Sequence, residues 1–193
     1  MAKCLVFAPR QYLFLLSDLW QLHLECEKAF ELASEPLLGA MRLQWLYDAL
    51  ETAQAPVGHE LLAKLLSYED KTSFIQMVCI WQKSLQEAGL SAQAQCEASY
   101  AACFIEMAKI CDIPITDISS QVIKKIGISM AQSKAGFSEI APVSKQDIRK
   151  ACGKNADWLV AINETVQIAN IKNVSADNLL IFRLFWRIYL KGR

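Results

Sequence analysis

The sequence has little of what marks extended, disordered or strongly charged proteins. It contains 7 glycines and 5 prolines in 193 residues, which excludes collagen-like and low-complexity chains. Its 20 basic and 20 acidic side chains cancel to a formal net charge of zero, so no overall field attracts it to nucleic acid. With 53% apolar residues, the chain can bury one sizeable core, and we expect a single domain over residues 1–193.

Metal-ligand and catalytic spacings are also missing. The 7 cysteines include no CxxC pair, and their number is odd, which favours free thiols packed as small apolar groups in a reducing compartment. His23 and His59 have no HExxH context, and Cys26 near His23 has no orienting third group in the sequence. The cysteines therefore favour an intracellular, reducing compartment, such as a bacterial cytoplasm or a mitochondrial matrix.

No apolar run is long enough to cross a membrane, which takes about 18 residues. The most apolar stretch, LLIFRLFWRIYL at 179–190, is too short for that but apolar on nearly every face. Such a helix is either buried in the core or faces a partner or a membrane surface, and both alternatives stay open. The candidate partner-binding side chains in this stretch are Phe182, Phe185, Trp186 and Tyr189.

Apolar residues recur at helical spacing along most of the chain, and no strand pattern occurs. This periodicity predicts an all-α protein with about eight helices. Gly153 is a candidate interruption of the seventh helix. The expected helices cover residues 10–33, 34–53, 58–66, 71–88, 91–111, 118–134, 144–171 and 175–190.

The most specific stretch is SEPLLGAMRLQWLYDALE at 34–51. Pro36 suits the first turn of a helix, and Ser34 or Glu35 can cap it. With FAPR at 7–10 and GHELL at 58–62, this stretch resembles the squalene/phytoene synthase family, in the branch with a SEP, RLQWW and ALE signature. The resemblance covers residues 5–66 and implies a shortened isoprenoid-synthase-like helical bundle.

In that family, two DxxxD motifs on facing helices hold the Mg²⁺ ions that bind the substrate diphosphates. Acids at i and i+4 share a helix face and offer oxygen ligands to a hard cation. The register of the resemblance places the ends of the first motif at Glu27 and Glu31, which form either a remnant Mg²⁺ site or a solvated acidic face. The second motif is missing, because GISMAQSKAG at 127–136 contains no acid.

Other positions of the resemblance also bear on activity. Arg42 and Trp45 correspond to substrate-side residues, although packing or an ion pair between Arg42 and Asp48 explains the arginine equally well. In the fourth helix, Trp81 stands where the branch has arginine, and Cys79 stands where it has an acid. These departures weaken the case for catalysis.

Two functions follow from the resemblance. The first is a catalytically degenerate scaffold without a cofactor, because the branch includes a mitochondrial assembly factor for respiratory complex I. It implies a protein or lipid partner at a membrane surface, with the chain peripheral to the inner membrane. The zero net charge gives no reason to expect a nucleic-acid partner. The alternative is a prenyltransferase of terpenoid biosynthesis that condenses isoprenoid diphosphates with Mg²⁺ held by Glu27 and Glu31. The oligomeric state stays open in both.

Overall fold

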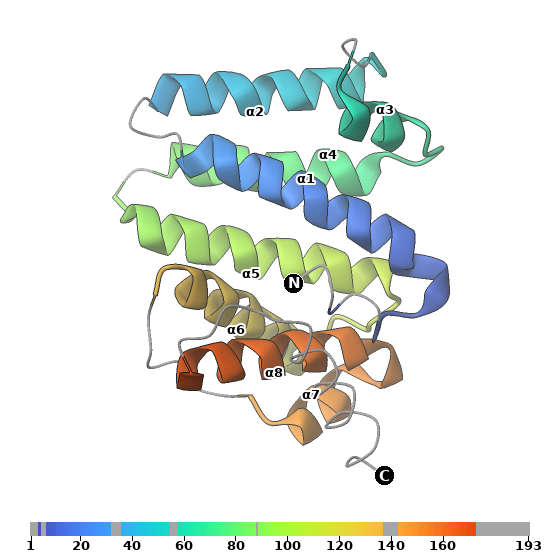
Figure 1. The fold of residues 1–193 in the computed structure, drawn as a ribbon, viewed down its shortest axis with the longest axis vertical. Helices are drawn as coiled ribbons and strands as arrows, with labels where there is room; N and C mark the ends of the chain where they lie inside the picture. The colour runs from blue at the N-terminus through green and yellow to red at the C-terminus, as the bar shows by residue number, and fades with distance from the viewer. Residues whose placement is uncertain are drawn as a thin grey trace. The chain divides into compact units, whose positions relative to one another are not determined.

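The structure, a computed structural model, describes residues 4, 7–31, 36–54, 58–87, 89–136 and 143–172. Every regular element in these ranges is helical, which confirms the predicted all-α class (Figure 1). The isoprenoid-synthase-like arrangement stays a prediction. The α-helices are α1 (Leu13–Glu31), α2 (Pro36–Glu51), α3 (Glu60–Leu66), α4 (Thr72–Gln86), α5 (Ala92–Ile110), α6 (Asp117–Lys134), α7 (Lys145–Cys152) and α8 (Asp157–Lys172), and the 3-10 helices are η2 (Arg10–Tyr12) and η3 (Lys154–Ala156).

None of these described helices combines the length and the apolar character needed to cross a membrane. The helix expected at 175–190 and the caps expected at Ser34 and Glu35 lie outside the described residues.

Local sequence signals set several helix ends. The hydroxyl of Thr116 accepts the backbone N–H of Ser119, which forms a capping box with it at the start of α6. Ser144 caps α7 by accepting the backbone N–H of Asp147. The single helix expected over 144–171 is divided in two, because Gly153 adopts a positive φ of 74° at the end of α7 and η3 follows.

The chain forms two compact units. Residues 15–99 make up one, which we call the central unit, and residues 1–14 with 100–193 make up the other, the terminal unit. The single domain predicted over residues 1–193 stays a prediction, because compactness does not show whether a unit folds alone.

In the central unit, α2 packs against α3 and α4. It also lies very close to α1, since a Cβ added to Gly39 would sit 2.6 Å from the backbone oxygen of Ala29. Only glycine fits at this crossing without a shift of the backbone. Fully buried apolar side chains of this unit include Leu16, Leu19, Leu22, Leu43, Leu46, Leu50, Phe74 and Trp81.

In the terminal unit, α6 packs against α7 and α8. A Cβ on Gly127 would lie 2.8 Å from the backbone oxygen of Tyr100 and 2.9 Å from the Cα of Ala101, so α6 crosses the middle of α5 backbone to backbone. The core positions predicted for residues 144–171 are confirmed, except that Ile168 lies outside the described side chains. The confirmed positions are Ile148, Cys152, Trp158, Leu159, Ile162 and Val166.

Candidate functional site

The two candidate metal ligands lie one turn apart on α1 but in different surroundings. Glu27 is buried, with 4% of its surface exposed, whereas Glu31 is exposed. A solvated acidic face therefore describes Glu31 and is wrong for Glu27. Burial of a carboxylate requires compensating interactions, which makes Glu27 part of the interior of the central unit.

The described residues do not fit the metal cluster of prenyl transfer. Across residues 4, 7–31, 36–54, 58–87, 89–136 and 143–172, no three Asp, Glu, His or Cys side chains gather closely enough to hold a metal ion. Mg²⁺ takes near-octahedral oxygen coordination through carboxylates and water. One buried and one exposed glutamate on a single helix supply too few ligands, so we derive no reaction step through Mg²⁺.

Arg42 joins α2 to α1 through an ion pair. Its guanidinium donates to Glu25 at 3.0 Å, and Lys28 donates to the other oxygen of that carboxylate at 2.8 Å. The ion pair between Arg42 and Asp48 considered from the sequence is therefore wrong, since Asp48 instead accepts from Gln44 at 2.7 Å. A pair that ties two helices together gives the arginine a structural role.

Two opposing influences act on the pKa of Glu25. Partial burial raises it, but the hydrogen bonds and positive charges of Lys28 and Arg42 outweigh burial and lower the pKa below its ordinary value of 4.5. Glu25 is therefore ionised at neutral pH and holds both cations.

Trp45 lies on the outer side of α2, with its ring centroid 5.5 Å from that of His59. The Nδ1 atom of His59 accepts the backbone N–H of Leu62 at 3.1 Å and so caps α3. The imidazole is thus engaged in helix capping, and Trp45 covers one side of it.

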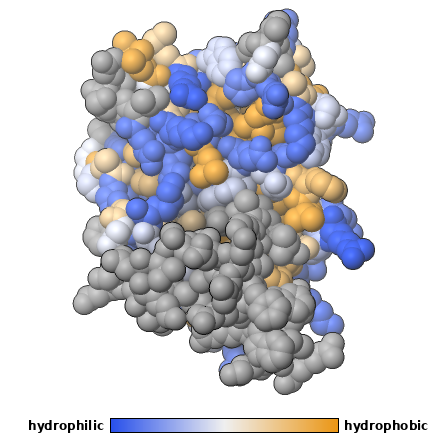
Figure 2. All heavy atoms as spheres, in the orientation of Figure 1, coloured by the Kyte–Doolittle hydropathy of each residue, from blue (hydrophilic) through white to orange (hydrophobic). Residues whose placement is uncertain are grey.

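Four large apolar side chains are exposed on α2 and form what we call the α2 apolar face. Residues four apart share a helix face, so Leu37, Met41 and Trp45 line up along one stripe and Leu38 adds to it. Hydrophobic atoms reach the surface where α2 begins, at the upper left of Figure 2. The exposed fractions are 72% for Leu37, 53% for Leu38, 59% for Met41 and 42% for Trp45.

Sequence reasoning missed a buried carboxylate in the same unit. Asp18, an acidic residue of α1, has no exposed surface. It accepts hydrogen bonds from Lys64 at 2.5 Å and from the hydroxyl of Tyr68 at 2.7 Å. The only sequence signal for this cluster is the i, i+4 spacing of Lys64 and Tyr68, which places both donors on one side of the chain.

The Asp18 cluster raises the pKa of Tyr68 from its ordinary value of 10.0 to about 12. Burial is the largest cause, followed by the hydrogen bond to Asp18 and the negative charge of that carboxylate. Tyr68 is therefore a neutral donor to Asp18 throughout the neutral range.

Trp81 fills the interior of the central unit. Its indole N–H donates to Nδ1 of His23 at 3.3 Å, and its ring lies 5.5 Å from that of Phe30. Both Trp81 and His23 are fully buried. Where the family branch has an arginine, this chain has an aromatic side chain packed among other rings.

The candidate partner-binding residues near the C-terminus lie outside the described residues. They are Phe182, Phe185, Trp186 and Tyr189.

Comparison with protein-family models, with curated proteins and with solved structures finds no match to this chain. Its relation to the squalene/phytoene synthases is therefore a prediction from the sequence signature.

Proposed function

We propose that this chain is a squalene/phytoene synthase-like protein without prenyl transfer activity, which acts as a helical binding scaffold at a membrane surface. The observation that carries the proposal is the α2 apolar face. A face of this kind costs free energy in water unless another molecule covers it. It also lies within the signature stretch at 34–51.

The chemistry of the α2 apolar face favours a protein partner. Tryptophan and methionine are enriched in protein interfaces, and clustered large side chains supply most of their binding energy. A helix that binds an anionic membrane carries several basic residues on its polar side. On α2 the single basic residue is Arg42, which is already paired with Glu25, whereas Asp48 and Glu51 are both exposed.

The family resemblance suggests the class of the partner protein. The family branch includes an assembly factor for respiratory complex I, so the partner class that we propose is a subunit of a membrane-bound respiratory complex during its assembly. This subunit then brings the chain to the membrane. The stretch at 179–190 is a second candidate for contact with the partner.

Loss of catalysis is supported by the ligand count. Prenyl transfer in this family needs metal ions that neutralise the leaving diphosphate. Asp117 is the only acidic residue of α6. On α1, Glu27 is buried whereas Glu31 is exposed. We therefore propose that the chain retains the helical shell without the reaction.

Site-specific photo-crosslinking tests the scaffold. A photoreactive amino acid replaces Met41 in the full chain, or Leu90 as the control, since Leu90 is also exposed in the same unit. We expect the probe at position 41 to crosslink one defined subunit of a membrane complex. The same crosslink should be lost when Trp45→Ser is added, and the probe at position 90 should not form it. Equal crosslinking from both positions, or crosslinking from 41 to lipid alone, would overturn the proposal.

An activity assay tests the absence of catalysis. We expect no release of diphosphate from farnesyl or geranylgeranyl diphosphate with Mg²⁺ present. Release that depends on Mg²⁺ and is lost in Glu27→Gln would establish the prenyltransferase instead.

A further inference from the structure

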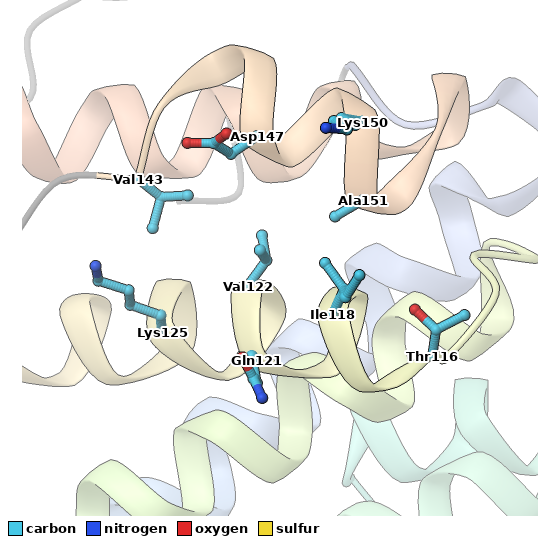
Figure 3. Close-up of a pocket in the computed structure, with 9 residues that line it drawn as sticks. All are labelled: Thr116, Ile118, Gln121, Val122, Lys125, Val143, Asp147, Lys150 and Ala151. Carbon is cyan, nitrogen blue, oxygen red and sulfur yellow. The ribbon is translucent and has the colours of Figure 1, made fainter.

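An open groove lies between α6 and α7 in the terminal unit. Its volume is about 640 Å³, within the ~300–1,000 Å³ typical of small-molecule sites. Figure 3 shows side chains of both helices facing the gap. The lining residues are Thr116, Ile118, Gln121, Val122, Lys125, Val143, Asp147, Lys150 and Ala151.

The floor of this groove is apolar. Ile118 and Val122 point from α6 toward the side of the groove that carries Val143 and Ala151 (Figure 3). Ile118 is 69% exposed, an unusual position for a large β-branched side chain. An apolar ligand that covered this floor would remove it from water.

Each wall of the groove contributes one lysine, Lys125 from α6 and Lys150 from α7. Neither forms an ion pair with any residue in the described ranges. The one acid of the lining is Asp147, which accepts a hydrogen bond from the Ser144 hydroxyl at 2.6 Å. The groove therefore combines an apolar floor with a net positive rim.

The dimensions argue against a protein helix as the occupant. One wall is α7, which has 8 residues and so extends about 12 Å at a rise of 1.5 Å per residue. A docked helix about 10 Å across would find little more than two turns of wall to contact. A single narrow chain with one charged end needs less contact area, and a long acyl chain can continue beyond α7 along α6, which has 18 residues.

We propose that this groove binds a free long-chain fatty acid, with the chain on the Ile118 and Val122 floor and the carboxylate held by Lys125 and Lys150. Lys125 and Lys150 lie toward opposite ends of the groove (Figure 3), and the flexible four-carbon stem of lysine allows both ammonium groups to turn toward a head group between them. The two lysines favour an anionic head group, and the apolar floor of the groove favours a hydrocarbon chain. The site is in the terminal unit and is independent of the α2 apolar face.

Calorimetric titration of the full chain with oleate below its micelle concentration tests this proposal. We expect Lys125→Gln and Lys150→Gln each to weaken binding about twofold to fivefold, the range of an exposed charge pair. Lys124→Gln is the matched control, because Lys124 is an exposed neighbour on α6 that does not line the groove. Asp147→Asn removes the opposing charge and should tighten binding.

Two other ligands test the contributions of the carboxylate charge and of the acyl chain separately. Oleyl alcohol has the chain without the charge and should bind more weakly than oleate, while acetate has the charge without the chain and should not bind. Ala151→Phe fills the groove from α7 and should abolish oleate binding, with circular dichroism showing that the helices remain.

Three outcomes would overturn the proposal. They are equal binding of oleate by Lys125→Gln, Lys150→Gln and Lys124→Gln, unchanged binding by Ala151→Phe, and attachment of the chain to neutral phosphatidylcholine vesicles without binding of monomeric oleate. Because crosslinking from Met41 does not involve this groove, the scaffold proposal and this one fail separately.

Discussion

The two units bury polar side chains of different kinds. Among the described residues of the central unit, Asp18, His23 and Glu27 are buried ionisable groups. In the described part of the terminal unit, the buried polar side chains are neutral: Ser119, Ser129 and Asn163. A buried charge costs several kcal/mol unless it is paired, so the central unit depends on exact pairing where the terminal unit depends on apolar packing.

This difference coincides with the sequence signature, most of which lies in the central unit. Buried ionisable groups are frequent in functional sites, but structural ion-pair networks contain them too. Asp18 has two donors within hydrogen-bond distance and no exposed surface. It therefore belongs to a network that holds α1 against the segment after α2.

The largest effect is expected from removing the Asp18 carboxylate. Asp18→Ala should lower the free energy of unfolding by about 3 kcal/mol, because it removes two hydrogen bonds to a charged acceptor and leaves a gap. Urea denaturation measures the loss. Asn163→Ala is the counterpart in the terminal unit and should cost about 1 kcal/mol, since its amide donates one neutral bond to the Val143 carbonyl at 2.8 Å. Equal losses in the two variants would contradict the contrast between the units.

Replacing the glycine at a helix crossing by alanine should lower the free energy of unfolding in both units, and more in the terminal unit. Gly127→Ala brings a methyl group against three backbone atoms, at 2.8, 2.9 and 3.0 Å, and should cost about 2 kcal/mol. Gly39→Ala meets one backbone oxygen, at 2.6 Å, and should cost about 1 kcal/mol, because a shift of one contact relieves the strain more easily than a shift of three. The better helix propensity of alanine offsets part of the strain at both positions. Lys124→Ala, at an exposed helical site, is the control and should be neutral in thermal unfolding.

Alkaline pH should destabilise the central unit through Tyr68. The folded-state pKa of about 12 lies above the ordinary value of 10.0, so the stability that Tyr68 contributes is complete below pH 10 and is lost as the pH rises toward 12. Ultraviolet titration of phenolate formation checks the pKa. In Asp18→Asn the pKa of Tyr68 should fall, because the hydrogen bond to a charged acceptor and its negative charge are removed. An unchanged titration would show that burial alone raises it.

The smallest effect concerns the ion pairs of Glu25. Glu25→Gln should cost about 0.5 kcal/mol, since both cations are largely exposed. Because the folded-state pKa is lowered, this contribution is present above the unfolded-state pKa and disappears as the pH falls through the folded-state value. Glu106→Gln, which breaks an exposed pair with Lys109 in the terminal unit, should cost less. Stability measured from pH 7 to pH 3 compares the two.

Several local features could be predicted from the sequence because they depend on neighbouring residues. Within the described residues, the first six helical ranges agree with the periodicity, and the start expected at 144 is confirmed because Ser144 caps α7. Gly153 was named as a candidate break, and its positive φ divides α7 from α8. In each case the determining contact spans only a few residues.

The candidate site was less predictable, because its contacts join distant segments. Asp18 and Glu27 are spaced like residues of a solvated face, yet both are buried. The sequence suggested Asp48, six residues later, as a partner of Arg42, which instead pairs with Glu25, 17 residues earlier. Periodicity shows which side chains share a face, and it does not show which face the other helices cover.

Helix propensity, capping and composition act within a few residues, so the local sequence sets most of the helices and leaves α6 with a single acid, Asp117. Tertiary packing sets the pairing of Asp18 inside the central unit, the exposure of the α2 apolar face, and the open groove beside the contact of α6 with α7, which has a lysine on each wall. These features depend on which helix faces meet, and that choice follows from the packing of the whole core rather than from any single stretch.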